Sequence, residues 1–453
     1  MMPMPDSVHV PVVVVGAGAA GLVAALAARE AGADVLVLER DPVPRGSTAL
    51  SAGLVPAAGT RWQAAAGIAD SPDLFAADIM AKSGGAADPA LVRTVAHAAG
   101  PALEWLHGRH GLPFSVITDF NYPGHSAHRM HGLPSRSGLE LVDALRAAAE
   151  AAGAMILCGA HVTGLDADAG GVSYGRPDGG REHVCCDALV LACNGYGGNP
   201  ALVRAHIPEM ADALYFGHPG NQGDALLWGR ALGAAERDLS GHQGHGSVAH
   251  PAGILVTWAT VTAGGVQVNA RGERFSDESH GYSEQAAQVL RQPGGVAWTV
   301  FDTRIAGVAR QFEDFRRAEE MRAIVEADDL AALASRMQVP EPALRATLAE
   351  AEGLKRTGGT DRFGRSFAGQ PVLVPPYRTV RVTGALFHTQ GGLQVDGFAR
   401  VLHPDGKPIP RLFAAGGAAC GVSGPKAEGY LSGNGLLTAV TLGRIAGAQA
   451  AGR

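Results

Sequence analysis

A run of glycines near the N-terminus has the residue types and spacing that bind the pyrophosphate of a dinucleotide. Gly16, Gly18 and Gly21 follow the apolar run 10–15, and a second strand-like run ends at Glu39. The first glycine permits a tight turn, the second lets the backbone approach phosphate, and the third lets helix and strand pack closely. Phosphates bind at the start of such a helix, and the acid binds ribose hydroxyls. The pattern predicts nucleotide contacts from Gly16, Gly18, Ala19, Ala20, Gly21 and Glu39.

The segment after Glu39 distinguishes between two dinucleotides. An NAD-binding domain normally continues directly into another βα unit. Here residues 46–53 form a second loop of small and hydroxyl-bearing side chains, which can run along an extended dinucleotide and reach a flavin. We therefore expect FAD, bound non-covalently, with further contacts from Arg40, Gly46, Ser47, Thr48, Ser51, Ala52 and Gly53.

The glycine run, this loop and several later segments together resemble the fumarate reductase and succinate dehydrogenase flavoprotein superfamily, which includes the 3-ketosteroid dehydrogenases. The later segments are 161–165, 188–199, 220–225, 411–417 and 432–436. The resemblance covers nearly the whole chain and is weak between 60 and 150. It implies FAD contacts from Val162, Asn194, Gly195, Asp224, Gly416, Gly417, Ser432, Asn434, Gly435 and Leu436. Such families often have Glu where Gly417 stands, so one usual contact with the flavin ribose is missing.

Two histidines and two arginines carry the chemistry of fumarate reductases in this superfamily. The histidines and one arginine bind the substrate carboxylates, and the other arginine donates the proton. Local motifs retain the histidines as His250 and His388, but Tyr282 and Tyr430 stand at the arginine positions. Two phenols cannot replace two bidentate cations in holding a dianion. The pattern therefore lacks a dicarboxylate clamp.

The tyrosines instead resemble the active-site pattern of the 3-ketosteroid dehydrogenases. Tyr430, Leu431 and Ser432 are similar to the Tyr-x-Ser motif of the members that form a 4-ene. Tyr122 stands roughly where another tyrosine lines the ketosteroid site. Desaturation beside a ketone needs a donor to the carbonyl oxygen, a base for the α proton and an acceptor of hydride. The resemblance implies that Tyr430, with Ser432, polarises the carbonyl and that Tyr282 takes the proton.

We therefore expect an FAD-dependent desaturase of a cyclic ketone or a 3-ketosteroid-like substrate. His250 and His388 would bind a second polar group of the substrate or tune Tyr282. One alternative is an ene reductase of an unsaturated carboxylate, which the retained histidines support, and another is a flavin-binding protein without turnover. Purely structural roles also remain open for the tyrosines and histidines.

The partners follow from the motifs that the sequence contains. No haem C-x-x-C-H motif or cluster of iron–sulfur cysteines is present, so electrons would pass to a quinone, a redox protein or oxygen. The histidines between 125 and 131 and between 242 and 250 have irregular spacing, so we expect no metal. The net charge of −6, without a basic run, argues against nucleic acid.

The elements that position these residues suggest an α/β fold. We expect a Rossmann-type FAD-binding domain over 1–245 and 389–453, split in sequence by an inserted α+β substrate cap over 246–388. Within the cap, 312–337 and 341–355 are expected to be helical.

Length and composition bound the remaining possibilities. The 453 residues are 46% hydrophobic and 18% charged, which suits a large buried core. Five cysteines without a C-x-x-C pair fit a reducing cytoplasm. The N-terminus lacks the positive region of a signal peptide, and the apolar run 10–15 is too short to span a membrane.

Overall fold

The computed structural model describes residues 8–452, which form two compact units. The first unit contains residues up to 206, residues 217–242 and residues from 388 onward. The second contains 207–216 and 243–387. Residues 207–216 thus join the second unit, although the expected boundaries place them in the FAD part. Residues 1–7, on which the expectation about a signal peptide rests, lie outside the described residues.

An eight-stranded, mostly parallel sheet is the framework of the first unit. Its strand order is β19-β20-β9-β1-β2-β6, and β7 and β8 extend it as a hairpin beside β9. The strands are β1 (Val8–Val15), β2 (Val35–Leu38), β6 (Met155–Leu157), β7 (His161–Leu165), β8 (Gly171–Gly175), β9 (Arg181–Leu191), β19 (Arg400–Leu402) and β20 (Pro408–Ala414). Residues 12–15 of β1 lie opposite 188–191 of β9 and are almost fully buried, as continuous apolar runs predict for central parallel strands. This α/β arrangement confirms the predicted fold class.

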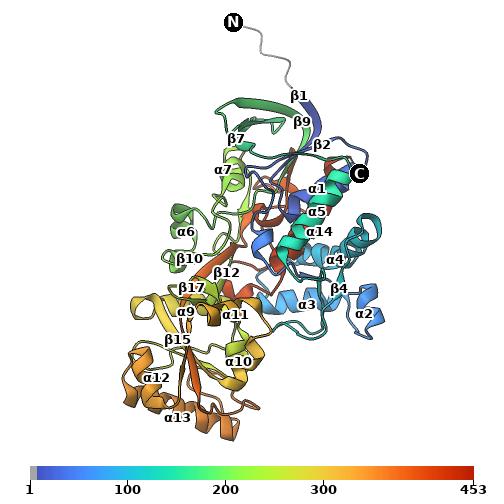
Figure 1. Cartoon of the computed structure of the whole chain (residues 1–453). Helices are drawn as coiled ribbons and strands as arrows, with labels where there is room; N and C mark the ends of the chain where they lie inside the picture. Colours follow the sequence, from blue (N-terminus) through green and yellow to red (C-terminus); the bar gives the residue numbers. More distant parts are fainter. Residues whose placement is uncertain (1–7, 453) are drawn as a thin grey trace. The chain divides into compact units, whose positions relative to one another are not determined.

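Helices from opposite ends of the chain pack together in this unit. Helix α1 (Ala19–Glu30) follows the glycine turn, and α14 (Asn434–Ala450) lies beside it (Figure 1). A side chain at Gly443 of α14 would lie 2.6 Å from the carbonyl oxygen of Ala20. The helix backbones can therefore approach closely because this position carries no Cβ.

Other helices and short strands complete the first unit. Its remaining α-helices are α2 (Arg61–Ala65), α3 (Pro72–Lys82), α4 (Pro89–His110), α5 (Gly138–Ala151), α6 (Pro200–His206) and α7 (Asp224–Ala231). Strands β3 (Val55–Pro56), β4 (Ser115–Val116) and β5 (Met130–Gly132) form a small sheet. Strand β11 (Glu236–Arg237) pairs with β18 (Gly392–Leu393).

The second unit is built on a seven-stranded sheet around the long strand β17 (Tyr377–Thr389), whose last two residues belong to the first unit. The sheet order is β13-β12-β17-β15-β14, and β10 and β16 also pair with β17. Its strands are β10 (Leu214–Tyr215), β12 (His242–Ala249), β13 (Ile254–Leu255), β14 (Val266–Val268), β15 (Val296–Asp302) and β16 (Ile324–Ala327). Its helices are α8 (Ala259–Thr262), α9 (Tyr282–Leu290), α10 (Thr303–Ala309), α11 (Glu313–Glu320), α12 (Leu330–Met337) and α13 (Glu341–Thr357).

The two expected cap helices have different outcomes. Helix α13 confirms the prediction over 341–355 and is two residues longer. The prediction of one helix over 312–337 is wrong, because β16 separates α11 from α12. The β-branched pair Ile324 and Val325 lies in β16, which pairs with β17 more than 50 residues later. Strand pairing therefore overrides the local helical pattern.

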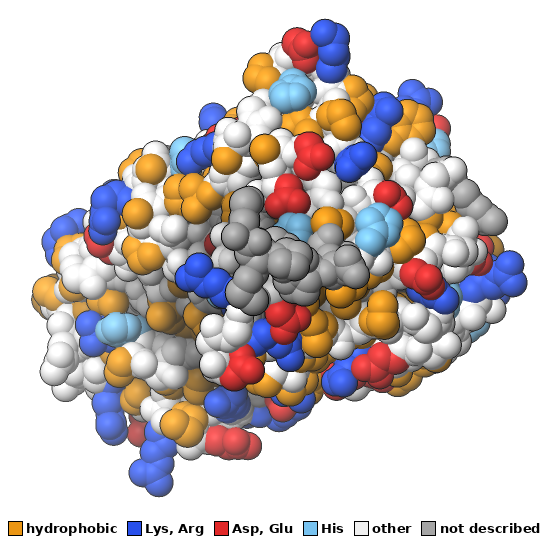
Figure 2. Space-filling view, turned by 90° about the horizontal axis from the view of Figure 1, so that it is seen from above, with side chains coloured by type: hydrophobic (Ala, Val, Ile, Leu, Met, Phe, Trp, Pro, Cys, Tyr) orange, Lys and Arg blue, Asp and Glu red, His pale blue; other side chains and the backbone are white. Residues whose placement is uncertain are grey.

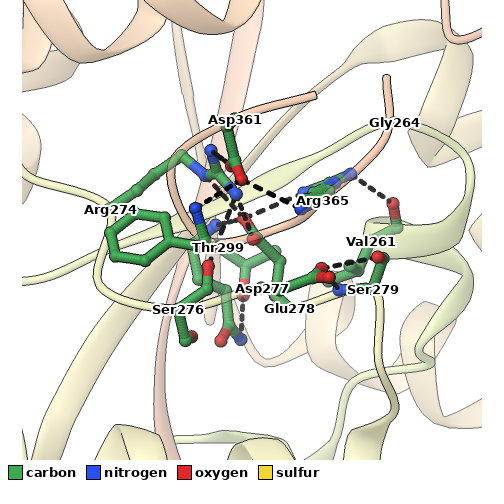
Figure 3. A network of polar contacts seen from close by, with 12 residues as sticks. Val261, Gly264, Arg274, Ser276, Asp277, Glu278, Ser279, Thr299, Asp361 and Arg365 are labelled. Atoms are coloured by element: carbon green, nitrogen blue, oxygen red, sulfur yellow. Dashed lines mark hydrogen bonds and ion pairs between the residues drawn. The ribbon is translucent and has the colours of Figure 1, made fainter. Parts of the chain in front are cut away.

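A buried ionic network lies in the second unit (Figure 3). Glu278 accepts hydrogen bonds from the N–H of Gln267 (3.0 Å) and from the guanidinium of Arg274, and it pairs with Arg365 at 2.9 Å. Arg274 also pairs with Asp361. The side chains of Glu278 and Arg365 are at most 1% exposed. Since every charge here has an opposite charge beside it, burial of the set is tolerated.

Candidate functional site

The glycine turn has the geometry that its sequence predicts. Gly16 has a φ of +100°, and a side chain there would lie 2.7 Å from the carbonyl oxygen of Ala192. A side chain at Gly21 would come within 3.0 Å of the carbonyl carbon of Gly16. At Gly18 the nearest atom would be 3.4 Å away, so protein packing does not require that glycine. Gly18 instead leaves the backbone open to approach by a ligand.

Helix α1 begins in a way that suits a phosphate. Its N-cap residue, Gly18, makes no side-chain capping hydrogen bond. The N–H of Ala19 donates to Thr48 Oγ1 at 3.0 Å, which ties the turn to the loop after Glu39. The uncapped first turn therefore presents backbone N–H groups and a positive helix end to an anion.

Glu39 is held rigidly at the end of β2. Its carboxylate accepts hydrogen bonds from the N–H of Ala17 (2.7 Å) and of Asp41 (2.9 Å). Both hydrogen bonds come from the two loops that would flank a bound nucleotide. The predicted contact of Glu39 with ribose therefore requires little rearrangement of this side chain.

The loop 40–53 is joined to the segment 217–224 of the same unit. Arg40 donates to the carbonyl oxygen of Gly220, and Asn221 Nδ2 donates to Ser47 Oγ at 2.8 Å. Burial raises the pKa of Asp224, which the nearby Arg40 partly offsets. The fold thus gathers Arg40, Ser47 and Asp224, which the sequence predicted as FAD contacts.

The remaining predicted FAD contacts of this loop and of β7 have local structural roles as well. Ser51 donates to the carbonyl oxygen of Thr48 at 2.7 Å, with Ala52 following in the chain. Gly53 and Gly46 both have positive φ, and a side chain at Gly53 would meet the carbonyl of Ser137. Val162 is buried in β7, where it pairs with Tyr174. Their contacts with FAD remain predictions.

The C-terminal glycine segments form a second helix start whose N-cap residue has no side chain. Gly433, the N-cap of α14, has a φ of +89° and makes no side-chain capping hydrogen bond. Asn434 is fully buried, yet its Oδ1 has no hydrogen-bond partner among residues 8–452. Gly435 and Leu436 complete this first turn. An orphaned acceptor beside a helix N-terminus fits a ligand that has both N–H donors and partial negative charge, as a flavin does.

Gly417 has a specific reason to lack a side chain. A Cβ at this position would overlap Asn194 Oδ1 and would lie 3.1 Å from Gly195 N and from His388 Nε2. Asn194 itself has a φ of +68°, and its side chain accepts a hydrogen bond from Gly195 N at 2.8 Å. The neighbouring Gly416 also has a positive φ. Asn194 and His388 therefore occupy the space that the usual Glu would need.

Tyr430 lies four residues before the first residue of α14 and is buried. Burial raises the pKa of its phenol well above the ordinary value, although hydrogen bonds from the N–H groups of Gly433 and Gly435 oppose the shift. Burial also raises the pKa of Tyr122, which is close enough to affect Tyr430 electrostatically. The carbonyl oxygen of Ser432 accepts a hydrogen bond from His125 at 2.9 Å. The first unit thus brings Tyr122 and Tyr430 together as protonated phenols, with Ser432 near Tyr430 in sequence.

In the second unit, Tyr282 is the first residue of α9 and belongs to an aromatic cluster. Its ring stacks on His245 with centroids 4.9 Å apart and meets Trp258 edge-on at 6.5 Å. His245 also stacks on Phe387 at 5.4 Å. Burial lowers the pKa of His245 to about 3, so this imidazole is neutral at ordinary pH.

The two histidines predicted from local motifs are placed differently. His250 is exposed just after β12, where its backbone N–H donates to the carbonyl oxygen of Arg381 at 2.9 Å. His388 is half-buried, accepts a hydrogen bond from Gln390 at 2.8 Å, and has a pKa that burial lowers to about 4. Sequence reasoning missed His245 as a neighbour of Tyr282. No local signal identifies this contact, because it depends on how β12 packs against the start of α9.

Other site types receive no support from the described residues. No group of three or more His, Cys, Asp or Glu side chains within 8–452 could hold a metal ion. No helix in that range is long and apolar enough to cross a membrane. On the face drawn in Figure 2, basic and acidic side chains are interspersed rather than gathered by sign.

Comparison with known proteins identifies the family of the chain. The family described as "FAD binding domain" matches residues 11–436. A probable fumarate reductase, Ifc3, of Shewanella frigidimarina (strain NCIMB 400) is 31% identical over 449 residues, which are 97% of this chain and 74% of that protein. A 4-oxocyclohexanecarboxylate 2-dehydrogenase of Sinomonas cyclohexanicum is 27% identical, covering 98% of this chain and 93% of that protein. The solved structure of 3-ketosteroid-Δ4-(5α)-dehydrogenase from Rhodococcus jostii RHA1 superposes with a TM-score of 0.80 at 26% identity, covering 100% of this chain and 99% of that one.

Proposed function

The chain belongs to the FAD-binding flavoprotein superfamily of fumarate reductase and succinate dehydrogenase, and we propose that it desaturates a cyclic ketone. It is an FAD-dependent oxidoreductase, and FAD is its cofactor. The product of the proposed reaction has a C=C bond α,β to the carbonyl. The substrate would be a cyclic or 3-ketosteroid-like ketone.

The observation that carries this proposal is the pair Tyr282 and Tyr430 at the two positions where fumarate reductases of the superfamily use arginine. Tyr430 is buried, and Tyr282 packs against the rings of His245 and Trp258. Such apolar surroundings suit a ring ketone far better than a dianion. Two relatives support a ring ketone, because their names identify ring ketones as substrates; the substrate named for the first also carries one carboxylate.

Each side chain would have a definite role. Tyr430 is protonated because burial raises its pKa, so it can donate a hydrogen bond to the ketone oxygen as enolate charge develops. Ser432 would assist it, and Tyr122 would line the site. Tyr282, in its phenolate form, would accept the α proton and become the neutral phenol. Bound FAD would supply the acceptor for the hydride that leaves the β carbon.

The remaining contacts would bind the rest of the substrate. His388 would donate a hydrogen bond to a second polar group. His250, which is exposed after β12, would need a rearrangement to take part. The electron acceptor that reoxidises the flavin would be a quinone, a redox protein or oxygen.

Anaerobic mixing of the FAD-loaded protein with candidate substrates tests the proposal. Saturated cyclic ketones and saturated 3-ketosteroids should bleach the flavin absorbance, whereas succinate should not. Tyr282→Phe should abolish the bleaching and leave FAD bound, whereas Tyr377→Phe, on β17 of the same unit, should behave like the unmodified protein. Bleaching by succinate with no response to any ketone would overturn the proposal.

A further inference from the structure

Three buried side chains of the first unit form a hydrogen-bond chain that ends at His388. Asn434 Nδ2 donates to Ser423 Oγ at 3.0 Å, and Ser423 Oγ donates to Gln390 Oε1 at 2.8 Å. Gln390 Nε2 then donates to His388 Nδ1 at 2.8 Å. Gln390, Ser423 and Asn434 are each at most 3% exposed. The hydrogen-bond chain is directional because Ser423 and Gln390 each accept on the side of Asn434 and donate on the side of His388.

This direction determines the tautomer of His388. Since Nδ1 accepts a hydrogen bond, the single ring proton of the neutral imidazole must lie on Nε2. Protonation of Nδ1 would place two N–H donors face to face in a buried region. Burial opposes the charged ring as well and lowers the pKa of His388 to about 4. His388 is therefore a neutral donor through Nε2.

The Nε2 atom lies near two glycines, which leave space beside it. A Cβ at Gly417 would lie 3.1 Å from Nε2, and one at Gly435 would lie 4.0 Å away. Both glycines belong to the segments expected to hold FAD. The orphaned Oδ1 of Asn434, at the other end of the chain, lies next to Gly435 in sequence. The hydrogen-bond chain therefore links two groups that are available to bind a ligand, the Nε2–H of His388 and the Oδ1 of Asn434.

We propose that Gln390, Ser423 and Asn434 are positioning residues that hold His388 as a neutral Nε2–H donor to an uncharged oxygen of the substrate. This inference rests on the proposed function for the identity of the substrate as a ketone. A carboxylate at the same place would be desolvated opposite a donor without positive charge, which costs free energy. By keeping His388 neutral, the hydrogen-bond chain favours binding of a ketone or hydroxyl oxygen over binding of a carboxylate.

The second unit contains a histidine held in the same way. The N–H of Ser247 donates to Nδ1 of His245 at 3.2 Å, so the proton of the neutral ring lies on Nε2 there too. Rings of Tyr282, Trp258 and Phe387 surround it. His245 and His388 are thus both neutral imidazoles that accept at Nδ1 and can donate through Nε2, although different groups donate to them.

The tautomer can be measured directly on FAD-loaded protein labelled with ¹⁵N-histidine. Two-bond ¹H–¹⁵N correlation spectra should show His388, assigned by its loss in His388→Gln, as the Nε2–H form. Gln390→Glu replaces the donor with a carboxylate acceptor and should move the proton to Nδ1 or charge the ring. Gln311→Glu, the same substitution at an exposed site, should leave the His388 signals unchanged. An Nδ1–H form in the unmodified protein would overturn the inference.

Ligand preference gives a second, independent readout. Flavin absorbance changes on binding would give dissociation constants for cyclohex-2-enone and for cyclohex-1-ene carboxylate. Gln390→Glu should shift the ratio of the two constants toward the carboxylate by about tenfold, since a charged donor adds to a carboxylate hydrogen bond. Ser423→Ala should shift it in the same direction by less. An unchanged ratio in both variants would also overturn the inference.

The outcomes separate this inference from the proposed function. The Nε2–H form without flavin bleaching by any ketone would refute the desaturase and keep the positioning role. The Nδ1–H form with ketone-dependent bleaching would refute the positioning role alone.

Discussion

The close contact between α1 and α14 predicts that the substitution Gly443→Ala destabilises the protein. An alanine Cβ at this position would lie 2.6 Å from the carbonyl oxygen of Ala20 and 3.3 Å from its carbonyl carbon and Cα. All three obstacles are backbone atoms of a central helix, so no side-chain rotation can relieve them. Ordinary van der Waals contact begins near 3.4 Å, so the helices must separate by about 0.8 Å.

Two opposing effects determine how much this substitution changes the free energy of unfolding. Alanine favours a helix over glycine by about 1 kcal/mol. Overpacking of a well-packed core costs about 1–3 kcal/mol, and the upper end applies where backbone is the obstacle. We therefore expect Gly443→Ala to lower the free energy of unfolding by about 2 kcal/mol. Because Ala20 belongs to the predicted phosphate-binding turn, FAD affinity should fall as well.

Thermal unfolding of the FAD-loaded and FAD-free proteins, followed by circular dichroism and flavin fluorescence, measures both effects. Gly108→Ala is the matched control, since it lies in α4 of the same unit and its Cβ would have no neighbour within 4 Å. That variant should be stabilised by about 0.5–1 kcal/mol. At Gly447 the Cβ would lie 2.7 Å from the carbonyl carbon of Ala24, closer than the equivalent contact at Gly443, so Gly447→Ala should be the least stable of the three. A Gly443→Ala variant as stable as Gly108→Ala would refute the reasoning about helix contact.

Three further predictions concern charged or titrating groups. Glu39→Gln loses the anion that accepts two backbone N–H groups, and the dissociation constant for FAD should rise about tenfold in a fluorescence titration. Glu278→Gln leaves Arg365 buried without a counter-charge, and the free energy of unfolding in urea should fall by about 3 kcal/mol. His245 has a folded pKa of about 3 against 6.5 when unfolded, so the stability that it contributes is complete above pH 6.5 and is lost as the pH falls toward 3. Unmodified protein should therefore lose on the order of 2 kcal/mol more than His245→Phe between pH 7 and pH 4.5.

Matched controls make these outcomes decisive. Glu320→Gln, at an exposed position of α11, should change neither FAD affinity nor stability measurably. Unchanged FAD affinity in Glu39→Gln would remove that residue from the cofactor site. A Glu278→Gln protein as stable as Glu320→Gln would mean that the network does not depend on its charge. Parallel acid titrations of the unmodified and His245→Phe proteins would contradict the expected neutral state of His245.

Local sequence patterns predicted the structure correctly where residues close together in the sequence form it. The glycine turn, α1 and Glu39 lie within one short βαβ segment, so their spacing predicts both the geometry and the binding of a dinucleotide. Helix α13 is likewise amphipathic and starts after a proline. The segment 312–337 failed because β16 forms through pairing with β17, and the strength of such a pairing depends on residues far away in the sequence.

The sequence by itself therefore determined that the chain binds a dinucleotide, and it predicts that tyrosines stand where fumarate reductases have the arginines of a dicarboxylate clamp. Which histidine meets Tyr282 was decided only by the tertiary structure, because His245 and His250 are equally plausible as local motifs and the packing of the β12 and α9 segments chooses one. The position of the ring proton of His388 likewise depends on the tertiary structure. Its hydrogen-bond chain joins residues 388, 390, 423 and 434, and only folding brings their donors and acceptors into register. Residue types are encoded locally, whereas the direction of a buried hydrogen bond depends on every partner in its chain.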